Sequence, residues 1–268
     1  MYDEGAGAEL RGNTVGNVRR LEGVRSPELG NRRDVDVYLP PSYQDSGRHY
    51  PVVYMHDGQN LFDHALSFAG EWHVDDTMER IAAEGVEAII VGVPNMGPER
   101  ADEYSPFRDE RLGGGRGDLY VRFLTDTLKP LVDEQFRTRR EPGQTGLIGS
   151  SMGGLISLHG FLQRPDVFGF AGVMSPSLWF ARGAIFETVR HVTRWSGRLY
   201  LDTGTGEGRA QVRQAREMAR LLRRGAAHPR LQMRYVEARD AGHNEEAWAS
   251  RFEHAIRWLL PRRQEVNW

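Results

Sequence analysis

The 268-residue chain contains no cysteine and only one lysine, Lys129, and its apolar runs are short. Without cysteine the protein can form no disulfide, no thiolate-ligated zinc site and no cysteine nucleophile. The longest apolar stretches, such as residues 88–91, are far shorter than the ~20 residues that cross a bilayer. Any covalent catalysis must therefore use another side chain. The sequence indicates no cofactor and no membrane partner.

An excess of charge of either sign is also absent. The chain has 35 basic and 37 acidic residues, for a formal net charge of −2. The densest basic clusters, residues 137–140 and 220–224, have acidic neighbours or end a predicted helix, and we interpret them as solvated surface. Because a phosphate backbone is held by a basic surface, nucleic acid is excluded as a partner and a small-molecule substrate is expected.

The composition, with 39% hydrophobic and 27% charged residues, is typical of a globular protein. Residues 1–20 are rich in Gly, Arg and Asn without periodicity, which predicts a flexible or edge segment. Residues 21–268 are expected to form one domain, without a large lid domain. The first residues lack the basic start and apolar stretch of a secretory signal, which favours a cytoplasmic location. The oligomeric state is left open.

Short apolar runs alternate with segments of helical spacing. Residues 34–39 alternate in polarity and predict a half-buried strand, whereas the other runs are continuous and predict buried strands: 50–55, 88–93, 145–148, 170–174, 198–201 and 231–236. The predicted helices are 74–83, 119–136, 153–162, 210–223 and 245–260. This rhythm predicts an α/β fold with a mostly parallel, doubly wound sheet and helices on both faces. The long loop 94–117 is expected to be functional or mobile.

A Gly-x-Ser-x-Gly pattern lies at residues 149–153, between a predicted strand and a predicted helix. In that context the pattern is typical of a nucleophile elbow, in which a sharp turn exposes the serine hydroxyl. The alternative is a chance turn of small residues, and the position between strand and helix favours the functional interpretation. Ser150 lies one residue too early for the glycine spacing. The sequence therefore predicts Ser151 as the nucleophile.

A serine hydroxyl needs a base, and histidine is the natural base near neutral pH. Nine histidines are available. In α/β-hydrolases the chain order is serine, acid, histidine. His243 follows the last predicted strand and precedes the final helix, so it is the predicted base. His159, His191, His228 and His254 are interpreted as structural.

The acid is expected after the strand at residues 198–201. Two carboxylates are available there, Asp202 at the end of the strand and Glu207 in the loop beyond it. A loop carboxylate can reach the second ring nitrogen of the histidine and fix its tautomer. We favour Glu207 and keep Asp202 as the alternative, since an aspartate at that place also caps turns.

The oxyanion hole needs two N–H groups. The residue after the nucleophile, Met152, supplies one, and we predict that the backbone of Gln59 supplies the other from the loop after residues 52–55. Several acidic and histidine residues also cluster between residues 56 and 76. None has the His-x-x-x-His spacing that places two imidazoles on one helix face, so no metal site is expected.

These motifs together resemble a family of α/β-hydrolases that includes enterobactin-type siderophore esterases, feruloyl esterases, S-formylglutathione hydrolase and the mycolyltransferases. The likeness extends over about residues 34–260 and rests on four segments: 54–63, 149–154, Ser175-Pro176-Ser177 with Trp179, and 242–245 with Trp248. The resemblance implies the oxyanion role for Gln59 and the acid role for Glu207, although some siderophore esterases are thought to use a serine–histidine dyad.

The resemblance also implies the activity. The chain lacks the Ser-Gly-Leu-Thr-Cys stretch of S-formylglutathione hydrolases at residues 57–60, and it shows no export signal of the kind that mycolyltransferases carry. The expected function is a serine carboxylic-ester hydrolase of the siderophore, feruloyl or acetyl-carbohydrate type. The alternatives are acyl transfer to an alcohol and ligand binding on an inactive hydrolase scaffold. The candidate substrate contacts are Asn60, Asn95, Arg100, Glu103, Tyr104 and Trp179.

Overall fold

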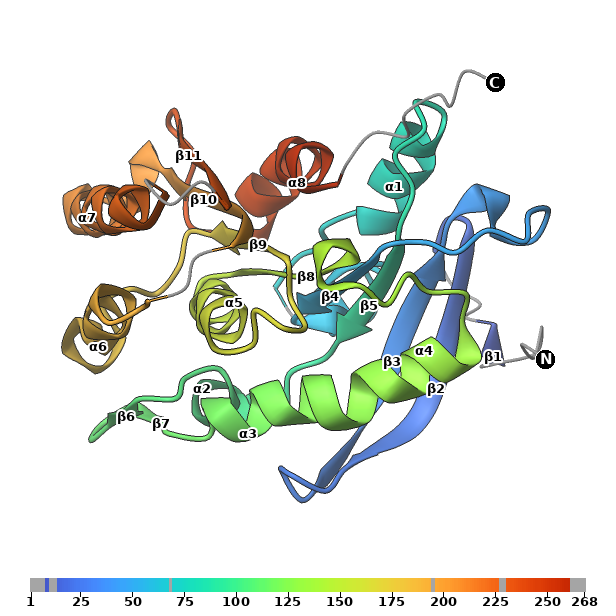
Figure 1. The fold of residues 1–268 in the computed structure, drawn as a ribbon, viewed down its shortest axis with the longest axis horizontal. Coiled ribbons are helices and arrows are strands. Elements are labelled where there is room, and N and C mark those ends of the chain that lie inside the picture. Colours follow the sequence, from blue (N-terminus) through green and yellow to red (C-terminus); the bar gives the residue numbers. More distant parts are fainter. Residues whose placement is uncertain (1–7, 10–13, 68, 194–195, 227–229, 261–268) are drawn as a thin grey trace.

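The computed structural model describes residues 8–9, 14–67, 69–193, 196–226 and 230–260. In this described part, a nine-stranded sheet forms the centre, with strand order β1-β2-β3-β5-β4-β8-β9-β10-β11 (Figure 1). The strands are β1 (Ala8–Glu9), β2 (Asn17–Ser26), β3 (Asn31–Leu39), β4 (Val52–His56), β5 (Ile89–Val93), β8 (Thr145–Ser150), β9 (Phe170–Met174), β10 (Gly197–Gly204) and β11 (Leu231–Ala238).

The sheet is parallel from β5 to β11 and antiparallel in its N-terminal part. Every neighbouring pair from β5 through β4, β8, β9 and β10 to β11 is parallel. The pairs β1–β2, β2–β3 and β3–β5 are antiparallel. The mostly parallel α/β sheet predicted from the alternation of apolar runs and helical segments is confirmed.

Helices cover both faces of the sheet, as the doubly wound prediction requires. Helices α1 (Val74–Ala82) and α8 (Glu245–Leu259) lie on one face (Figure 1), where Met78, Trp248 and Phe252 enter one core cluster. The opposite face packs a second cluster, to which Phe123 and Leu155 belong. The helices on that face are α3 (Gly117–Arg122), α4 (Lys129–Gln135), α5 (Met152–Gln163), α6 (Phe180–Arg190) and α7 (Arg209–Ala226).

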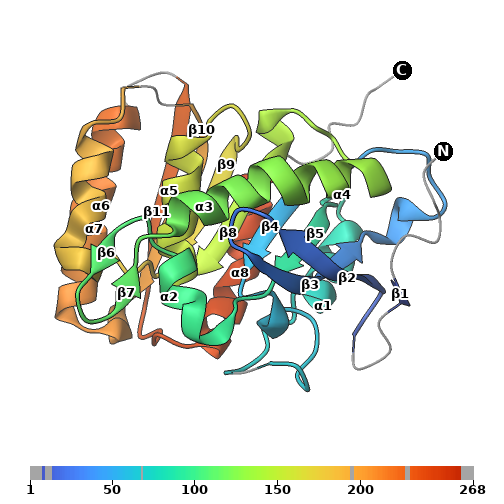
Figure 2. The same ribbon diagram turned by 90° about the horizontal axis from the view of Figure 1, so that it is seen from below.

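The helix predicted at residues 119–136 is one rod that crosses the sheet (Figure 2), but it is not uniformly α-helical. A π-helical segment, Phe123–Leu128, connects α3 to α4. Pro130 follows directly, in the first turn of α4. Because proline has no N–H and its ring clashes with the carbonyl four residues earlier, a widened turn before it relieves the conflict.

The N-terminal strands differ from the prediction. Strand β2 was not predicted, since its arginines obscure the alternation of apolar residues. The half-buried strand expected at 34–39 is wrong in its burial, because β3 is covered on both faces from Val35 to Leu39. Asp36 is buried there because it pairs with Arg20 of β2 at 2.7 Å. Of residues 1–20, the described ones place β1 at the edge of the sheet.

The segment 94–117 is structured, not a plain loop. It contains a 3-10 turn (Gly97–Glu99), helix α2 (Arg100–Glu103) and a hairpin of β6 (Arg108–Asp109) and β7 (Gly113–Gly114). Figure 2 shows the hairpin projecting beside α2. Glu103 forms an ion pair at 2.9 Å with Arg33 of β3, and both side chains are fully buried. Glu103 is therefore a structural anchor and cannot contact substrate, contrary to the prediction.

No helix in the described ranges is long and apolar enough to cross a membrane.

Candidate active site

The predicted nucleophile, acid and base converge at the carboxyl edge of the parallel strands. Ser151 follows β8 directly, Glu207 ends a 3-10 turn after β10, and His243 lies between β11 and α8. Loops at this edge of an α/β sheet are the usual place for ligand sites. Residues 92 and 36 positions apart in the chain are thereby brought into contact, 151 with 243 and 207 with 243.

Ser151 sits in a strained backbone conformation, with φ 55° and ψ −118°. Such positive φ values are uncommon outside glycine and mark functional turns. The turn is tight: a Cβ at Gly149 would lie 2.7 Å from the carbonyl carbon of Gly153 and 2.8 Å from the ring of His56. Helix α5 begins at Met152, immediately after the serine. This strand–turn–helix is the geometry expected of a nucleophile elbow.

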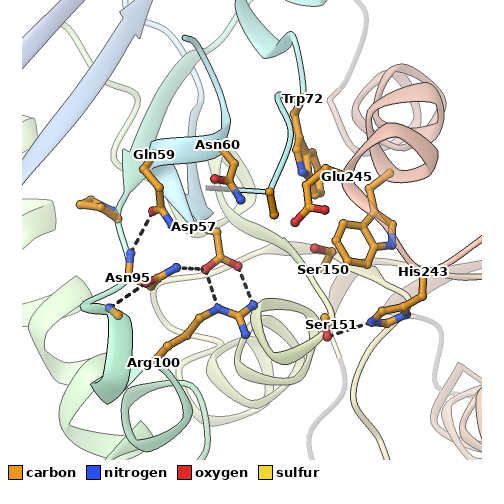
Figure 3. A pocket seen from close by; sticks show the side chains of 14 residues that line it. Asp57, Gln59, Asn60, Trp72, Asn95, Arg100, Ser150, Ser151, His243 and Glu245 are labelled. Atoms are coloured by element: carbon orange, nitrogen blue, oxygen red, sulfur yellow. Dashed lines mark hydrogen bonds and ion pairs between the residues drawn. The ribbon is translucent and has the colours of Figure 1, made fainter. Parts of the chain in front are cut away.

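A continuous hydrogen-bond chain joins the three predicted residues. Nε2 of His243 lies 3.0 Å from Oγ of Ser151, a contact drawn in Figure 3, and Nδ1 lies 2.8 Å from Oε2 of Glu207. The edge of the His243 ring packs against the Trp248 ring at a centroid distance of 4.9 Å. The imidazole can therefore take the serine proton on one nitrogen while the carboxylate stabilises the positive charge on the ring.

Glu207 is held at both oxygens. Its Oε1 accepts hydrogen bonds from the hydroxyl of Ser175 at 2.5 Å and from the backbone N–H of Gly204 at 2.6 Å. Burial by itself would raise the pKa of Glu207, but the hydrogen bonds from His243 and Ser175, with that backbone N–H, outweigh it and lower the pKa. The carboxyl is consequently kept as a carboxylate facing His243.

Asp202, the alternative acid, lies deeper in the fold. It is fully buried, and its Oδ1 accepts from the backbone N–H of Ser175 at 3.1 Å and lies 3.6 Å from Nη1 of Arg251. Burial raises its pKa to about 6, although the nearby Arg251 opposes this shift. None of its described contacts is with His243. The geometry therefore brings Glu207, not Asp202, to the imidazole.

A cavity of about 620 Å³ opens beside Ser151 and His243. That volume suits a drug-sized or larger small molecule. Figure 3 shows Asp57, Asn95 and Arg100 grouped on one wall and Trp72 and Glu245 on another, with Ser151 and His243 at the side. The lining residues are Asp57, Gln59, Asn60, Ala69, Trp72, Pro94, Asn95, Gly97, Arg100, Ser150, Ser151, His243, Glu245 and Trp248.

Of the two predicted oxyanion residues, Met152 follows the nucleophile in the chain and Gln59 lines the same cavity. Met152 is the first residue of α5, so its N–H has no acceptor within the helix. Gln59 lines the cavity within the 3-10 turn Gly58–Asn60, and its side-chain carbonyl accepts from the N–H of Asn95 at 3.2 Å. Gly58 permits this turn because a Cβ there would collide with the backbone of β5 at Gly92.

Only some of the predicted substrate contacts line the cavity. Asn60, Asn95 and Arg100 line the cavity. The prediction for Tyr104 is wrong, because its ring is fully buried and its hydroxyl accepts from the backbone N–H of Asp57 at 3.0 Å. Trp179 is 48% exposed but lies outside the cavity lining, so the cavity lends no support to a contact there.

The arginine on the cavity wall is paired with a carboxylate. Nε and Nη2 of Arg100 reach the two carboxylate oxygens of Asp57 at 2.7 and 2.8 Å (Figure 3). Asn95 adds a third hydrogen bond to Asp57 at 2.7 Å. Asp57 itself adopts a left-handed conformation with φ 56°. The sequence predicted Arg100 as a substrate contact and gave no sign of its pairing with Asp57, because the two residues are 43 positions apart.

Other residues at the site were missed. Ser177 places its hydroxyl 3.1 Å from Oγ of Ser151, and Arg251 donates to the hydroxyl of Ser175 at 2.9 Å. Ser175 and Ser177 belong to a motif that carried the family resemblance, which was the available signal. Arg251 gave no such signal, because an arginine on a helix is mostly solvent-exposed, whereas this side chain is only 8% exposed.

Among the histidine and acidic residues between 56 and 76, His73 lies 3.6 Å from Glu71 and 3.3 Å from Asp76. His56 is buried against the nucleophile turn, with Nδ1 2.9 Å from the hydroxyl of Tyr120. Burial lowers its pKa to about 4. Within the described ranges, no group of three or more histidine and acidic side chains is placed to hold a metal ion. His56 is therefore a neutral packing residue beneath the elbow.

The fold and this constellation define the class of the protein as an α/β-hydrolase. The sequence model of the family described as "Putative esterase" matches residues 26–259. The chain belongs to this esterase family.

Individual relatives agree with this assignment. An uncharacterized protein of Bacillus subtilis, YbbA, is 29% identical over 87% of this chain and 94% of its own length. The siderophore enterobactin esterase of Emericella nidulans is 26% identical over 58% of this chain and 57% of that protein. The crystal structure of the BES protein from Bacillus cereus superposes with a TM-score of 0.75 at 21% identity, covering 94% of this chain and 98% of that one. These similarities confirm the fold class.

Proposed function

We propose that the protein hydrolyses carboxylic esters through an acyl-enzyme on Ser151. The observation that carries the proposal is the unbroken chain of contacts from Ser151 through His243 to Glu207, at 3.0 and 2.8 Å. It opens on a cavity large enough for a small-molecule ester.

In the first half of the reaction, Nε2 of His243 takes the proton of Ser151 as Oγ attacks the ester carbonyl. A bond forms between Oγ and the carbonyl carbon, and the carbonyl oxygen becomes an oxyanion. His243 then gives the proton to the departing alcohol as the ester bond breaks. Glu207 holds the ring in the required tautomer and stabilises its positive charge.

The oxyanion is assigned to the backbone N–H groups of Met152 and Gln59. The N-terminal end of α5 adds the positive end of a helix dipole at this point. In the second half, water replaces the alcohol, His243 accepts its proton, and the acid is released from Ser151. Siderophore, feruloyl and acetyl-carbohydrate esters are the candidate substrate types, and they all present a carbonyl flanked by a polar or aromatic body.

The test compares two adjacent hydroxyls. Ser151→Ala should lower kcat/KM for p-nitrophenyl acetate by several orders of magnitude, since loss of such a nucleophile costs about 10⁶-fold in a well-studied hydrolase. Ser150→Ala, which changes the neighbouring buried hydroxyl, serves as the matched control and should retain activity within about tenfold. Activity that survives in Ser151→Ala would overturn the proposal.

Two further readouts separate the rival functions. A fluorophosphonate should label the wild-type protein at Ser151, and a protein that only binds ligands would stay unlabelled. Product analysis with added alcohols or sugars distinguishes hydrolysis from acyl transfer. Release of free acid at the same rate with and without acceptor is the expected result.

A further inference from the structure

The charges that line the cavity are unequally compensated. Four lining residues carry titratable or charged side chains: Asp57, Arg100, His243 and Glu245. Nε and Nη2 of Arg100 both donate to the carboxylate of Asp57, in a bidentate pair. His243 is engaged by Glu207 and Ser151. Glu245 has no ion-pair partner in the described part of the chain, and Arg100 and His243 act on it only at longer range.

Glu245 is not required for capping its own helix. The N-terminus of α8 is capped by Asn244, whose side chain accepts from the N–H of Ala247 at 2.9 Å. The side chain of Glu245 is half-buried, and Figure 3 shows its carboxylate turned into the cavity beside Trp72 and Ser150. A carboxylate in the first turn of a helix is stabilised by the dipole, but that role does not need a place in the cavity lining.

Two indole rings line the same cavity as this carboxylate. Trp72 and Trp248 both line the cavity, and their ring centroids are 6.1 Å apart. Aromatic rings attract cations through their quadrupole, and the attraction adds to that of a nearby carboxylate. Burial raises the pKa of Glu245 above its ordinary value, and a bound cation would lower it again.

We propose that Glu245, with Trp72 and Trp248, forms a subsite that selects substrates carrying a positively charged group, such as an ammonium, and rejects anionic ones. This inference rests on the proposed esterase function, because it concerns the substrate class of the same cavity. It narrows that class, because the ferric complex of a catecholate siderophore is a polyanion, and Arg100, the one arginine or lysine among the described lining residues, already pairs with Asp57. Esters with an amine or quaternary ammonium group fit the cavity instead.

The test uses three phenols of similar size as competitive inhibitors of p-nitrophenyl acetate hydrolysis. They are the cation meta-hydroxyphenyltrimethylammonium, its uncharged isostere meta-tert-butylphenol, and the anion meta-hydroxybenzenesulfonate. The cation should bind about tenfold more tightly than the isostere, and the anion should bind most weakly. Raising the salt concentration should reduce this preference.

Two variants locate the effect. Glu245→Gln should bring the ratio of inhibition constants for cation and isostere to within about twofold. Glu246→Gln removes a neighbouring carboxylate from the same helical turn but lies outside the cavity lining, and it should keep the wild-type ratio. Because the proteins are compared by the ratio of two inhibition constants, a change in turnover that affects both measurements equally cancels.

The two proposals fail in different ways. If the wild type shows no ester turnover, the esterase proposal falls, and isothermal titration calorimetry of the same three phenols still measures the charge preference. If turnover is normal but the anion binds as well as the cation, or Glu245→Gln keeps the preference, the subsite proposal falls and the esterase proposal stands.

Discussion

Ser175 donates a hydrogen bond from its hydroxyl to Oε1 of Glu207, and it does so from a left-handed backbone conformation with φ 40°. The same hydroxyl accepts from Nη2 of Arg251 at 2.9 Å. Oε2 of Glu207, the other oxygen, faces His243. A strained serine and a buried arginine thus orient the carboxylate that orients the imidazole. Strain of this kind persists where the surrounding structure over-determines it, and it concentrates at functional sites.

The identity of the acid can be tested with a pair of isosteric amides. Glu207→Gln removes the charge that faces His243 and should lower kcat/KM for p-nitrophenyl acetate about 10³-fold or more, as for the equivalent change in a serine protease. Asp202→Asn, the matched change in β10, should lower kcat/KM less than about tenfold, because the carboxyl of Asp202 does not contact the imidazole. A larger loss in Asp202→Asn than in Glu207→Gln would reverse the assignment.

The buried carboxyl of Asp202 should make stability depend on pH. Its pKa is about 6 in the folded protein, against about 3.9 in an unfolded chain. Between these values the folded state binds more protons, so the free energy of unfolding contributed by this group falls as the pH rises through 6. Asp202→Asn lacks this dependence.

Urea unfolding at pH 5 and pH 7.5 measures the effect. Between these two pH values, the wild type should lose about 1 kcal/mol more of its free energy of unfolding than Asp202→Asn does. An equal change in the two proteins would show that Asp202 titrates normally in the fold.

The pair of Arg100 and Asp57 should couple energetically. Arg100→Met leaves a mostly buried carboxylate without its bidentate partner, and we expect a loss of about 2 kcal/mol in the free energy of unfolding. Asp57→Asn in the same chain should recover part of the loss, with a coupling energy of about 1 kcal/mol in a double-mutant cycle.

An exposed pair in the same molecule serves as the control. Arg216 and Glu237 have the same bidentate geometry, at 2.8 and 2.7 Å, but they lie at the surface. Arg216→Met should change the free energy of unfolding far less than Arg100→Met, because water already solvates both charges. Equal losses in the free energy of unfolding at the two sites would mean that the charges in the cavity wall are solvated as well as those at the surface.

Local patterns in the chain were sufficient for the fold class and for the order of the site residues. The apolar runs that became β4, β5, β8 and β9 are continuous, because parallel strands covered on both faces need no polar side. The buried strand predicted at 231–236 is wrong in its burial, since β11 is the edge strand and most of its residues are only partly buried. The elbow at Ser151 and the turn at His243 depend on glycines and on their places after a strand, and both are visible in one sequence. Short-range sterics and periodicity therefore predicted which elements form and which loops carry the chemistry.

Only the tertiary structure decided which side chains meet. The sequence favours Glu207 as the acid but leaves Asp202 open, and the fold distinguishes them by burying Asp202 in β10 and placing Glu207 2.8 Å from His243. In the sequence Arg100 is a candidate substrate contact, and only the fold shows that it pairs with Asp57. Tyr104 was a candidate contact in a loop, and only the fold shows that it is buried against β4 and α3. The carboxylate of Glu245, which has no ion-pair partner among the described residues, is likewise identified only in the tertiary structure. Pairing and burial depend on contacts between residues distant in the chain, which composition and spacing do not encode.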